Sequence, residues 1–255
     1  MNFYMAKVSV RQCMADIRIN DVPMLRKNIE GDLTVQVPIN YLIETSGQQT
    51  LTIRAFPILG DISLRQGALC SVEVWRYDGS GRIISPMGQV CSLELIVGEN
   101  DMTSPYKYDM IRFYADVSYQ IIRWSNCEEI NDSRKISSSV AEFYQEIGRL
   151  LANKQYDQYM KIVRNRELNV CTALSLDEEE TNKRNQMLFD CLERGFVLQP
   201  MKGGKMHFYA NKRVVTVLNK DLKSILRFIN EETGEILSIE LLLGIKKGQK
   251  NLCVI

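Results

Sequence analysis

The spacing of apolar residues changes once along this chain, and that change most constrains its fold. Before residue 125 apolar and polar side chains alternate in short runs, as in residues 71–77, and turn residues separate these runs. Alternation places successive side chains on opposite faces of a strand, so each run has one face to bury. After residue 138 apolar residues recur at helical spacing instead. The chain is therefore expected to contain two domains of different class.

Residues 1–126 are predicted to form an antiparallel β-sandwich. The clearest alternating runs lie at 33–37, 51–56, 71–77, 90–97 and 111–117. With weaker runs they indicate about eight strands, a number typical of sandwiches and jelly rolls. The turn signal Asp78-Gly79-Ser80-Gly81 predicts a hairpin into Arg82-Ile83-Ile84.

Residues 127–138 are polar and aperiodic, which predicts a linker, and residues 139–255 are predicted to form an α+β domain. Ser139 and Glu142 match a capping box at the start of an amphipathic helix, and Ser175 and Glu178 match a second one. A short helix is expected between them, and Gly195 is expected to end the last helix. Strand-like runs follow at 206–210, 214–218, 225–229, 236–243 and 252–255. Two or three helices should then cover one face of a curved antiparallel meander.

Composition and charge exclude several classes of function. The 32 Lys and Arg residues nearly cancel the 31 Asp and Glu residues, so no net field favours nucleic acid or an anionic membrane. No apolar run approaches the ~20 residues of a membrane span. Lys7 and Arg11 interrupt the first residues before a signal-peptide core develops, so we expect a cytoplasmic protein.

Histidine and cysteine usage argues against a metal or cofactor. His207 is the single histidine, which excludes two-histidine chemistry, and none of the 7 cysteines forms a C-x-x-C motif. Free, buried thiols are expected. The acidic run 177–180 points around a helix, so its carboxylates cannot converge on one divalent cation and should offset the helix dipole instead. The glycines of residues 201–205 lack the spacing of a phosphate-binding loop, which favours a turn.

The second half resembles a known family. Its order of helices and then strands, with Val140-Ala141-Glu142-Phe143-Tyr144 leading into residues 154–159, resembles the start of nuclear transport factor 2-like domains. The resemblance covers about residues 138–255. It implies a cone-shaped fold, shared with ketosteroid isomerase-like enzymes, in which an inward carboxylate acts as base. Glu240 is the best-placed carboxylate for that role.

A ligand pocket in this domain is the alternative to a binding protein. The residues expected to line it are Phe143, Tyr144, Ile147, Phe208, Leu226 and Phe228, with His207 and Tyr209 on one face of a strand. A single histidine on a strand is more often structural than catalytic. The first half, at residues 19–23 and 38–43, loosely resembles jelly-roll carbohydrate-binding modules, which would need exposed coplanar aromatic rings.

Our leading expectation is a non-enzymatic protein-binding module, because no convergent set of titratable groups emerges. Tyr106 and Tyr108 follow Thr103-Ser104-Pro105 in a predicted loop, where we expect them to contact the partner. Neutral charge and reduced cysteines suit a bacterial immunity-type protein that neutralises a toxin, or an accessory protein of a secretion machine. The partner and the oligomeric state stay open.

Overall fold

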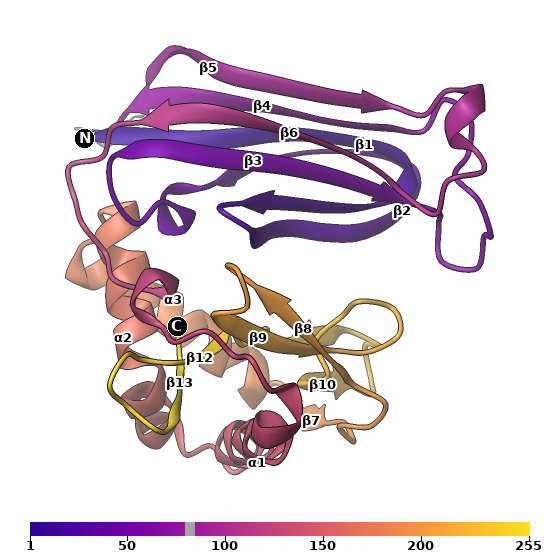
Figure 1. Ribbon diagram of the computed structural model, residues 1–255. Coiled ribbons are helices and arrows are strands. Elements are labelled where there is room, and N and C mark those ends of the chain that lie inside the picture. Colours follow the sequence, from indigo (N-terminus) through magenta and orange to yellow (C-terminus); the bar gives the residue numbers. More distant parts are fainter. Residues whose placement is uncertain (80–84) are drawn as a thin grey trace. The chain divides into compact units, whose positions relative to one another are not determined.

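The computed structural model describes residues 1–79 and 85–255, and the chain divides into two compact units, Met1–Ile121 and Ile122–Ile255 (Figure 1). Each unit is described by itself. The α+β class is confirmed, because antiparallel strands occur in both units and the α-helices in the second. No helix among the described residues has the length and apolar character needed to cross a bilayer.

The first unit is an antiparallel sheet. Its strands, over the described residues, are β1 (Asn2–Ile19), β2 (Val22–Pro38), β3 (Gly47–Phe56), β4 (Leu69–Asp78), β5 (Ser85–Ile96) and β6 (Lys107–Ala115), with short 3-10 turns η1 (Asn40–Leu42) and η2 (Glu99–Asp101). The hydrogen-bonded order is β5-β4-β1-β3-β6, and β2 also pairs with β1. β1 pairs with β4 over Asn2–Arg11 and with β3 over Met14–Ile19, so the sheet curls along this strand.

A reversal of the alternation at Gln12 of β1 keeps the interior continuous through that curl. Before it the buried apolar residues stand at even positions, and after it they stand at odd positions: Tyr4, Ala6, Val8 and Val10, then Cys13, Ala15, Ile17 and Ile19. The register with β2 shifts between Arg11 and Cys13, and Gln12 between them has a φ of 50°. In β1 one residue, Gln12, stands opposite two residues of β2, Glu30 and Gly31. The left-handed conformation of Gln12 reverses the alternation, so both halves of β1 bury their apolar side chains.

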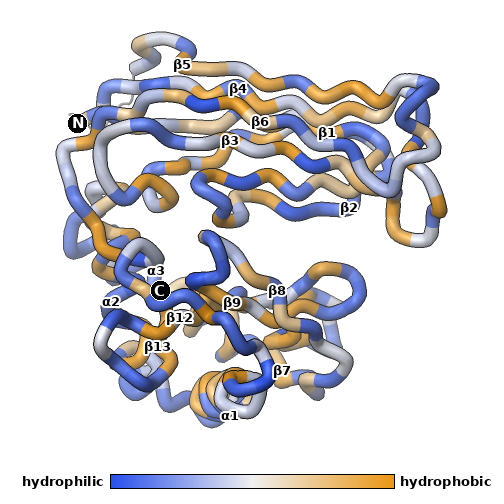
Figure 2. The backbone as a smooth tube through the Cα atoms, viewed as in Figure 1, coloured by the Kyte–Doolittle hydropathy of each residue, from blue (hydrophilic) through white to orange (hydrophobic). Residues whose placement is uncertain are grey.

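The predicted β-structure is therefore confirmed in part. The alternating runs lie in strands β2 to β6, and alternation along these strands is visible in Figure 2. Hydrogen bonding joins the six strands of the described residues into one curled sheet, and it does not separate them into the two layers of a sandwich. β4 and β5 pair as a hairpin, but Ser80, Gly81 and residues 82–84 of the predicted turn lie outside the described residues.

The second unit, described in full, contains a 3-10 turn, three helices and seven short strands. They are η3 (Trp124–Asn126), α1 (Ser133–Ala152), α2 (Tyr156–Leu174), α3 (Glu178–Glu193), β7 (Phe196–Leu198), β8 (Lys205–Tyr209), β9 (Val214–Leu218), β10 (Arg227–Asn230), β11 (Ile236–Ser238), β12 (Leu243–Ile245) and β13 (Leu252–Val254). The strands form two antiparallel sheets, β11-β10-β7 and β13-β12-β9-β8, where one meander was predicted. Between β9 and β10 only the isolated bridge Leu218↔Ser224 forms, so the ladder breaks there.

The helix boundaries correct both predicted capping boxes. α1 begins earlier, because Asp132 accepts a hydrogen bond from the backbone N–H of Arg134, and Ser139 and Glu142 are exposed inside the helix. At α3 the box is formed by Asp177 and Glu180, two residues after the predicted pair. Ser175 instead ends α2 in a left-handed conformation. α2 is also a full helix of 19 residues, where a short one was predicted.

Two local predictions in this unit are confirmed. Gly195, with a φ of 84°, follows the end of α3, where a left-handed residue without a Cβ is favoured. β10 and β11 pair as the hairpin expected around Gly234, whose backbone N–H donates to the carbonyl of Asn230. The sequence therefore predicts the helix end at Gly195 and the hairpin at Gly234 correctly.

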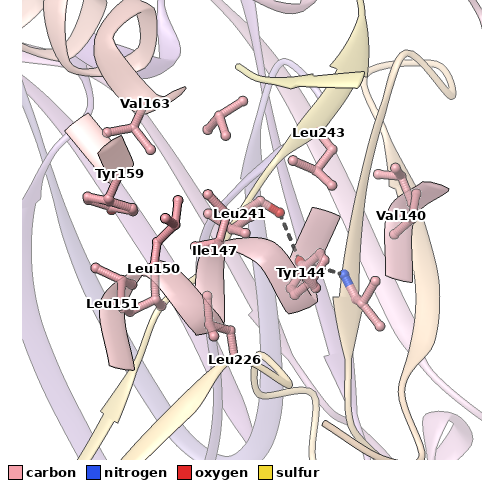
Figure 3. Close-up of a cluster of buried hydrophobic side chains, with 14 of the residues drawn as sticks. Val140, Tyr144, Ile147, Leu150, Leu151, Tyr159, Val163, Leu226, Leu241 and Leu243 are labelled. Atoms are coloured by element: carbon pink, nitrogen blue, oxygen red, sulfur yellow. Dashed lines mark hydrogen bonds between the residues drawn. The ribbon is translucent and has the colours of Figure 1, made fainter. Parts of the chain in front are cut away.

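Side chains of α1, α2 and the strands fill the interior of this unit (Figure 3). The fully buried members include Tyr144, Ile147, Tyr159, Leu226 and Phe228. Packing is close at Gly204, where a Cβ would lie 2.6 Å from Val217 Cγ1. Burial of these apolar and aromatic side chains is the main stabilising contribution in a unit of this size.

Candidate functional site

The predicted pocket residues of the second unit do not surround one cavity. Tyr144 and Phe228 are 1% and 0% exposed and belong to the packed core, and Phe143 and Phe208 pack against it half-buried. His207 lies half-buried in β8 opposite Thr216, and Tyr209 is buried two residues later. Neighbours in a strand face opposite sides, so His207 and Tyr209 point away from the face that Phe208 uses.

The hydroxyl of Tyr144 is engaged inside the core. It accepts a hydrogen bond from the backbone N–H of Val217 at 3.0 Å and donates to the carbonyl of Leu241 at 3.2 Å (Figure 3). It also lies 3.1 Å from Thr216 Oγ1. Glu240, the carboxylate that an isomerase-like mechanism would require, is exposed between β11 and β12. These contacts give Tyr144 a structural role.

The glycine loop and the acidic run also have structural explanations. Gly204 approaches Val217 and Ile225 too closely for any Cβ, so packing alone requires glycine there. Asp177 and Glu180 cap α3. Among residues 1–79 and 85–255, no cluster of three or more His, Cys, Asp or Glu side chains has the geometry to hold a metal ion.

The cysteines in the described residues are free thiols. Burial raises the pKa of the Cys13 thiol to about 11 and that of Cys91 to about 11. It also raises the pKa of Cys70, with a further contribution from nearby Cys13. A reactive cysteine needs a lowered pKa, so these three thiols are poor nucleophiles.

The most distinctive exposed feature lies on β6 of the first unit. Alternate residues at this strand place Tyr106, Tyr108, Met110, Arg112 and Tyr114 on one face, a set that we call the tyrosine row. Tyr106, Tyr108, Met110 and Tyr114 are 45%, 62%, 51% and 67% exposed. The tyrosine row is therefore a continuous line of large side chains on the solvent face of a sheet.

The predicted loop around Tyr106 and Tyr108 is wrong for Tyr108. β6 begins at Lys107, so Tyr106 directly precedes the strand and Tyr108 lies within it. The strand extends this far because Tyr108 pairs with Arg54 of β3. Pro105, which cannot donate a backbone hydrogen bond, stands just outside the ladder.

The sheet holds the tyrosine row rigidly. β6 pairs with β3 continuously, from Ala115 opposite Gly47 to Lys107 opposite Ala55. On the other face of β6, Phe113 and Ala115 are buried and anchor the strand. The ring of Tyr106 lies 5.6 Å from the ring of Phe56 and 6.0 Å from that of Tyr108, so the first rings support one another.

An ion pair fixes the start of β6. Lys107 Nζ lies 2.7 Å from Asp101 Oδ2 and donates to the carbonyl of Ile96 at 2.8 Å. The Lys107 ammonium holds the pKa of the Asp101 carboxyl below its usual value, and the backbone N–H of Gly98 contributes in the same direction. The turn that delivers β6 is thus tied to the end of β5.

Tyrosine, methionine and arginine are the residue types enriched in protein interfaces. A signal for the tyrosine row was present in the sequence: Phe113 and Ala115 alternate with Met110, Arg112 and Tyr114. Sequence reasoning singled out Tyr106 and Tyr108 but not Met110, Arg112 or Tyr114. The alternation shows two different faces without showing which one is exposed. Comparison with protein-family models, curated proteins and solved structures finds no match for this chain.

Proposed function

We propose that this chain is a non-enzymatic protein-binding module and that the tyrosine row is its contact surface. The observation that supports it is the row of five interface-type side chains on the solvent face of β6. Rings fixed on a sheet lose little conformational freedom when a partner covers them. The packed core around Tyr144 and Phe228 offers no comparable support for catalysis.

A protein partner fits the tyrosine row better than a carbohydrate does. Sugar rings stack on aromatic rings that lie in a common plane, whereas Tyr106 and Tyr108 are tilted by 33° to each other. Met110 and Arg112 also interrupt the aromatic residues, which suits a surface of mixed chemistry. We also propose that the first unit is a sandwich-like binding module. The curl of its sheet, where β1 leaves β4 and pairs with β3, supports this arrangement.

In its sharper form, the proposal makes this chain a bacterial immunity-type protein that neutralises a toxin, or an accessory protein of a secretion machine. Its test is co-expression of the tagged chain with the products of neighbouring genes, followed by a measured Kd for any complex. A chain that stays monomeric and forms no complex with those products would contradict this sharper form.

The contact surface is tested with the double variant Tyr108→Thr/Tyr114→Thr, because threonine retains the β-propensity of tyrosine. We expect a loss of affinity of about 100-fold or more, since central aromatic residues dominate binding energies. The matched control is Met87→Thr/Ile96→Thr on β5, which removes two side chains that are 54% and 51% exposed. Equal Kd values for both variants and the unaltered chain would refute the proposed surface, and glycan binding lost only in the tyrosine variant would assign it to carbohydrate.

A further inference from the structure

A cavity of about 560 Å³ lies between α2 and α3, apart from the tyrosine row. Its apolar wall is formed by Met160, Leu168 and Cys171 of α2 and by Leu176 after it. This volume is within the range of cavities that bind small molecules. A second cavity, of about 180 Å³, lies beside it between the same helices and shares Met160, Glu167 and Asn185.

The sequence of α3 explains why the cavity is not filled. From Glu178 to Gln186 this helix has no apolar side chain, so its first half cannot cover the apolar wall of α2. Leu188, Phe189 and Leu192 then pack against the core in its second half. Leu168 is consequently 55% exposed, an unusual position for leucine beside a cavity.

An ion pair spans the two helices at the cavity. Glu167 of α2 is buried, and it accepts hydrogen bonds from Arg166 Nε at 2.7 Å and from Arg184 Nε of α3 at 3.2 Å. Arg166 also donates to the hydroxyl of Tyr159 at 3.2 Å. The helices are thus joined by long charged side chains at this level, which keeps them apart where apolar contacts would draw them together.

Charge distinguishes the two ends of the cavity. Arg164 lines one end, and Asp177 and Glu178 line the other, where α2 gives way to α3. The acidic run continues through Glu179 and Glu180. A helix N-terminus contributes about half a positive charge, which four carboxylates exceed, so this end is net negative.

We propose that this cavity binds an amphiphilic cation. Its apolar chain lies against Met160, Leu168 and Cys171, and its ammonium group lies at Asp177 and Glu178. Two independent features support it: an apolar wall left uncovered by α3, and carboxylates at one end of that wall. This cavity lies in the second unit and the tyrosine row in the first. An experiment that contradicts one of the two proposals therefore leaves the other standing.

The test uses decylamine, decanoate and decanol below their aggregation concentrations, titrated into the full chain at pH 7 and followed by calorimetry and two-dimensional NMR. Decylamine should bind at least about tenfold more tightly than decanoate, with decanol between them, because the chain is constant and only the head-group charge changes. The perturbed NMR signals should come from α2 and the first half of α3.

Two variants locate the site. Leu168→Lys should abolish decylamine binding, since it places a like charge on the apolar wall, whereas the control Met187→Lys alters a residue of α3 that is 62% exposed and does not line the cavity. Glu178→Gln should reduce the preference for decylamine over decanoate several-fold. Circular dichroism confirms that each variant is folded. Equal binding of decylamine and decanoate, unchanged binding by Leu168→Lys, or binding of an amphipathic peptide but not of decylamine would overturn the proposal.

Discussion

The core of the second unit and strand β6 of the first use tyrosine in opposite ways. In the helix-containing unit, Tyr144 and Tyr159 are each 1% exposed, and their hydroxyls have hydrogen-bond partners inside the fold. On β6 of the sheet unit, Tyr108 and Tyr114 point to solvent and are 62% and 67% exposed. The same residue type is thus a core component at Tyr144 and Tyr159 and a surface feature on β6.

This difference separates structural from functional aromatic residues. A buried hydroxyl must be satisfied, so Tyr144 is required by its neighbours regardless of any ligand. An exposed tyrosine on a sheet has no such requirement, and several in a line are not explained by folding. Sites are therefore better sought on β6 than among the aromatic residues of the second core.

The strongest challenge to this comparison is Gln12→Pro, because the left-handed conformation of Gln12 reverses the inner and outer faces of β1. Proline fixes φ at about −65°, so the alternation cannot reverse at residue 12 and one half of the strand turns its buried residues outward. We therefore expect the first unit to lose its cooperative unfolding transition. The control is Gln12→Gly, because glycine adopts a φ of 50° without strain and should leave stability equal or higher. Circular dichroism and hydrogen exchange measure both. A proline variant that unfolds like the unaltered chain would show that the conformation of Gln12 does not set the faces.

Tyr144→Phe tests the structural role of the buried hydroxyl. It leaves the Val217 N–H and the Leu241 carbonyl without their partner, so we expect a loss of about 2–3 kcal/mol in the free energy of unfolding. The comparison variant is Tyr156→Phe, which removes an exposed hydrogen bond to Glu193 and should cost less than about 1 kcal/mol. Urea titration provides both values. Similar costs for the two variants would mean that burial of Tyr144 is not decisive.

Alkaline pH should destabilise the sheet unit through its thiols. Cys13 has a pKa raised from 9.0 to about 11, so between these pH values the unfolded chain loses a proton that the folded chain retains. Stability is full below pH 9 and falls as the pH rises toward 11, by about 2 kcal/mol for this thiol. Cys13→Ala should flatten the dependence even if it lowers stability at pH 7. A pH dependence that is identical in the variant would remove Cys13 as the cause.

Substitution in the tyrosine row should have the smallest effect on stability. Tyr108→Thr and Tyr114→Thr change exposed positions and keep β-propensity, so we expect shifts within about 0.5 kcal/mol. Thermal unfolding checks this without any partner. A loss above about 2 kcal/mol in either variant would indicate that the row stabilises the sheet, and the contrast between the two sets of tyrosines would then fail.

Much of the secondary structure was predictable because it depends on local spacing. The change from period two to period 3.6, the end of α3 at Gly195 and the hairpin at Gly234 are all short-range features. The helix starts were wrong because several polar residues near each start can cap a helix. Asp132 and Asp177 do so in place of Ser139 and Ser175.

The sequence by itself determined most of the segments that become strands or helices, β1 excepted, and that their apolar residues gather on one face. Only the tertiary structure decided that Gln12 reverses the faces of β1, that Tyr108 and Tyr114 are outside, and that a cavity opens beside Leu168. The physical reason is that propensity and alternation depend only on residues that are close together in the chain. Which face is covered depends on strands and helices that are distant in sequence, such as β3 for β6 and the polar half of α3 for α2.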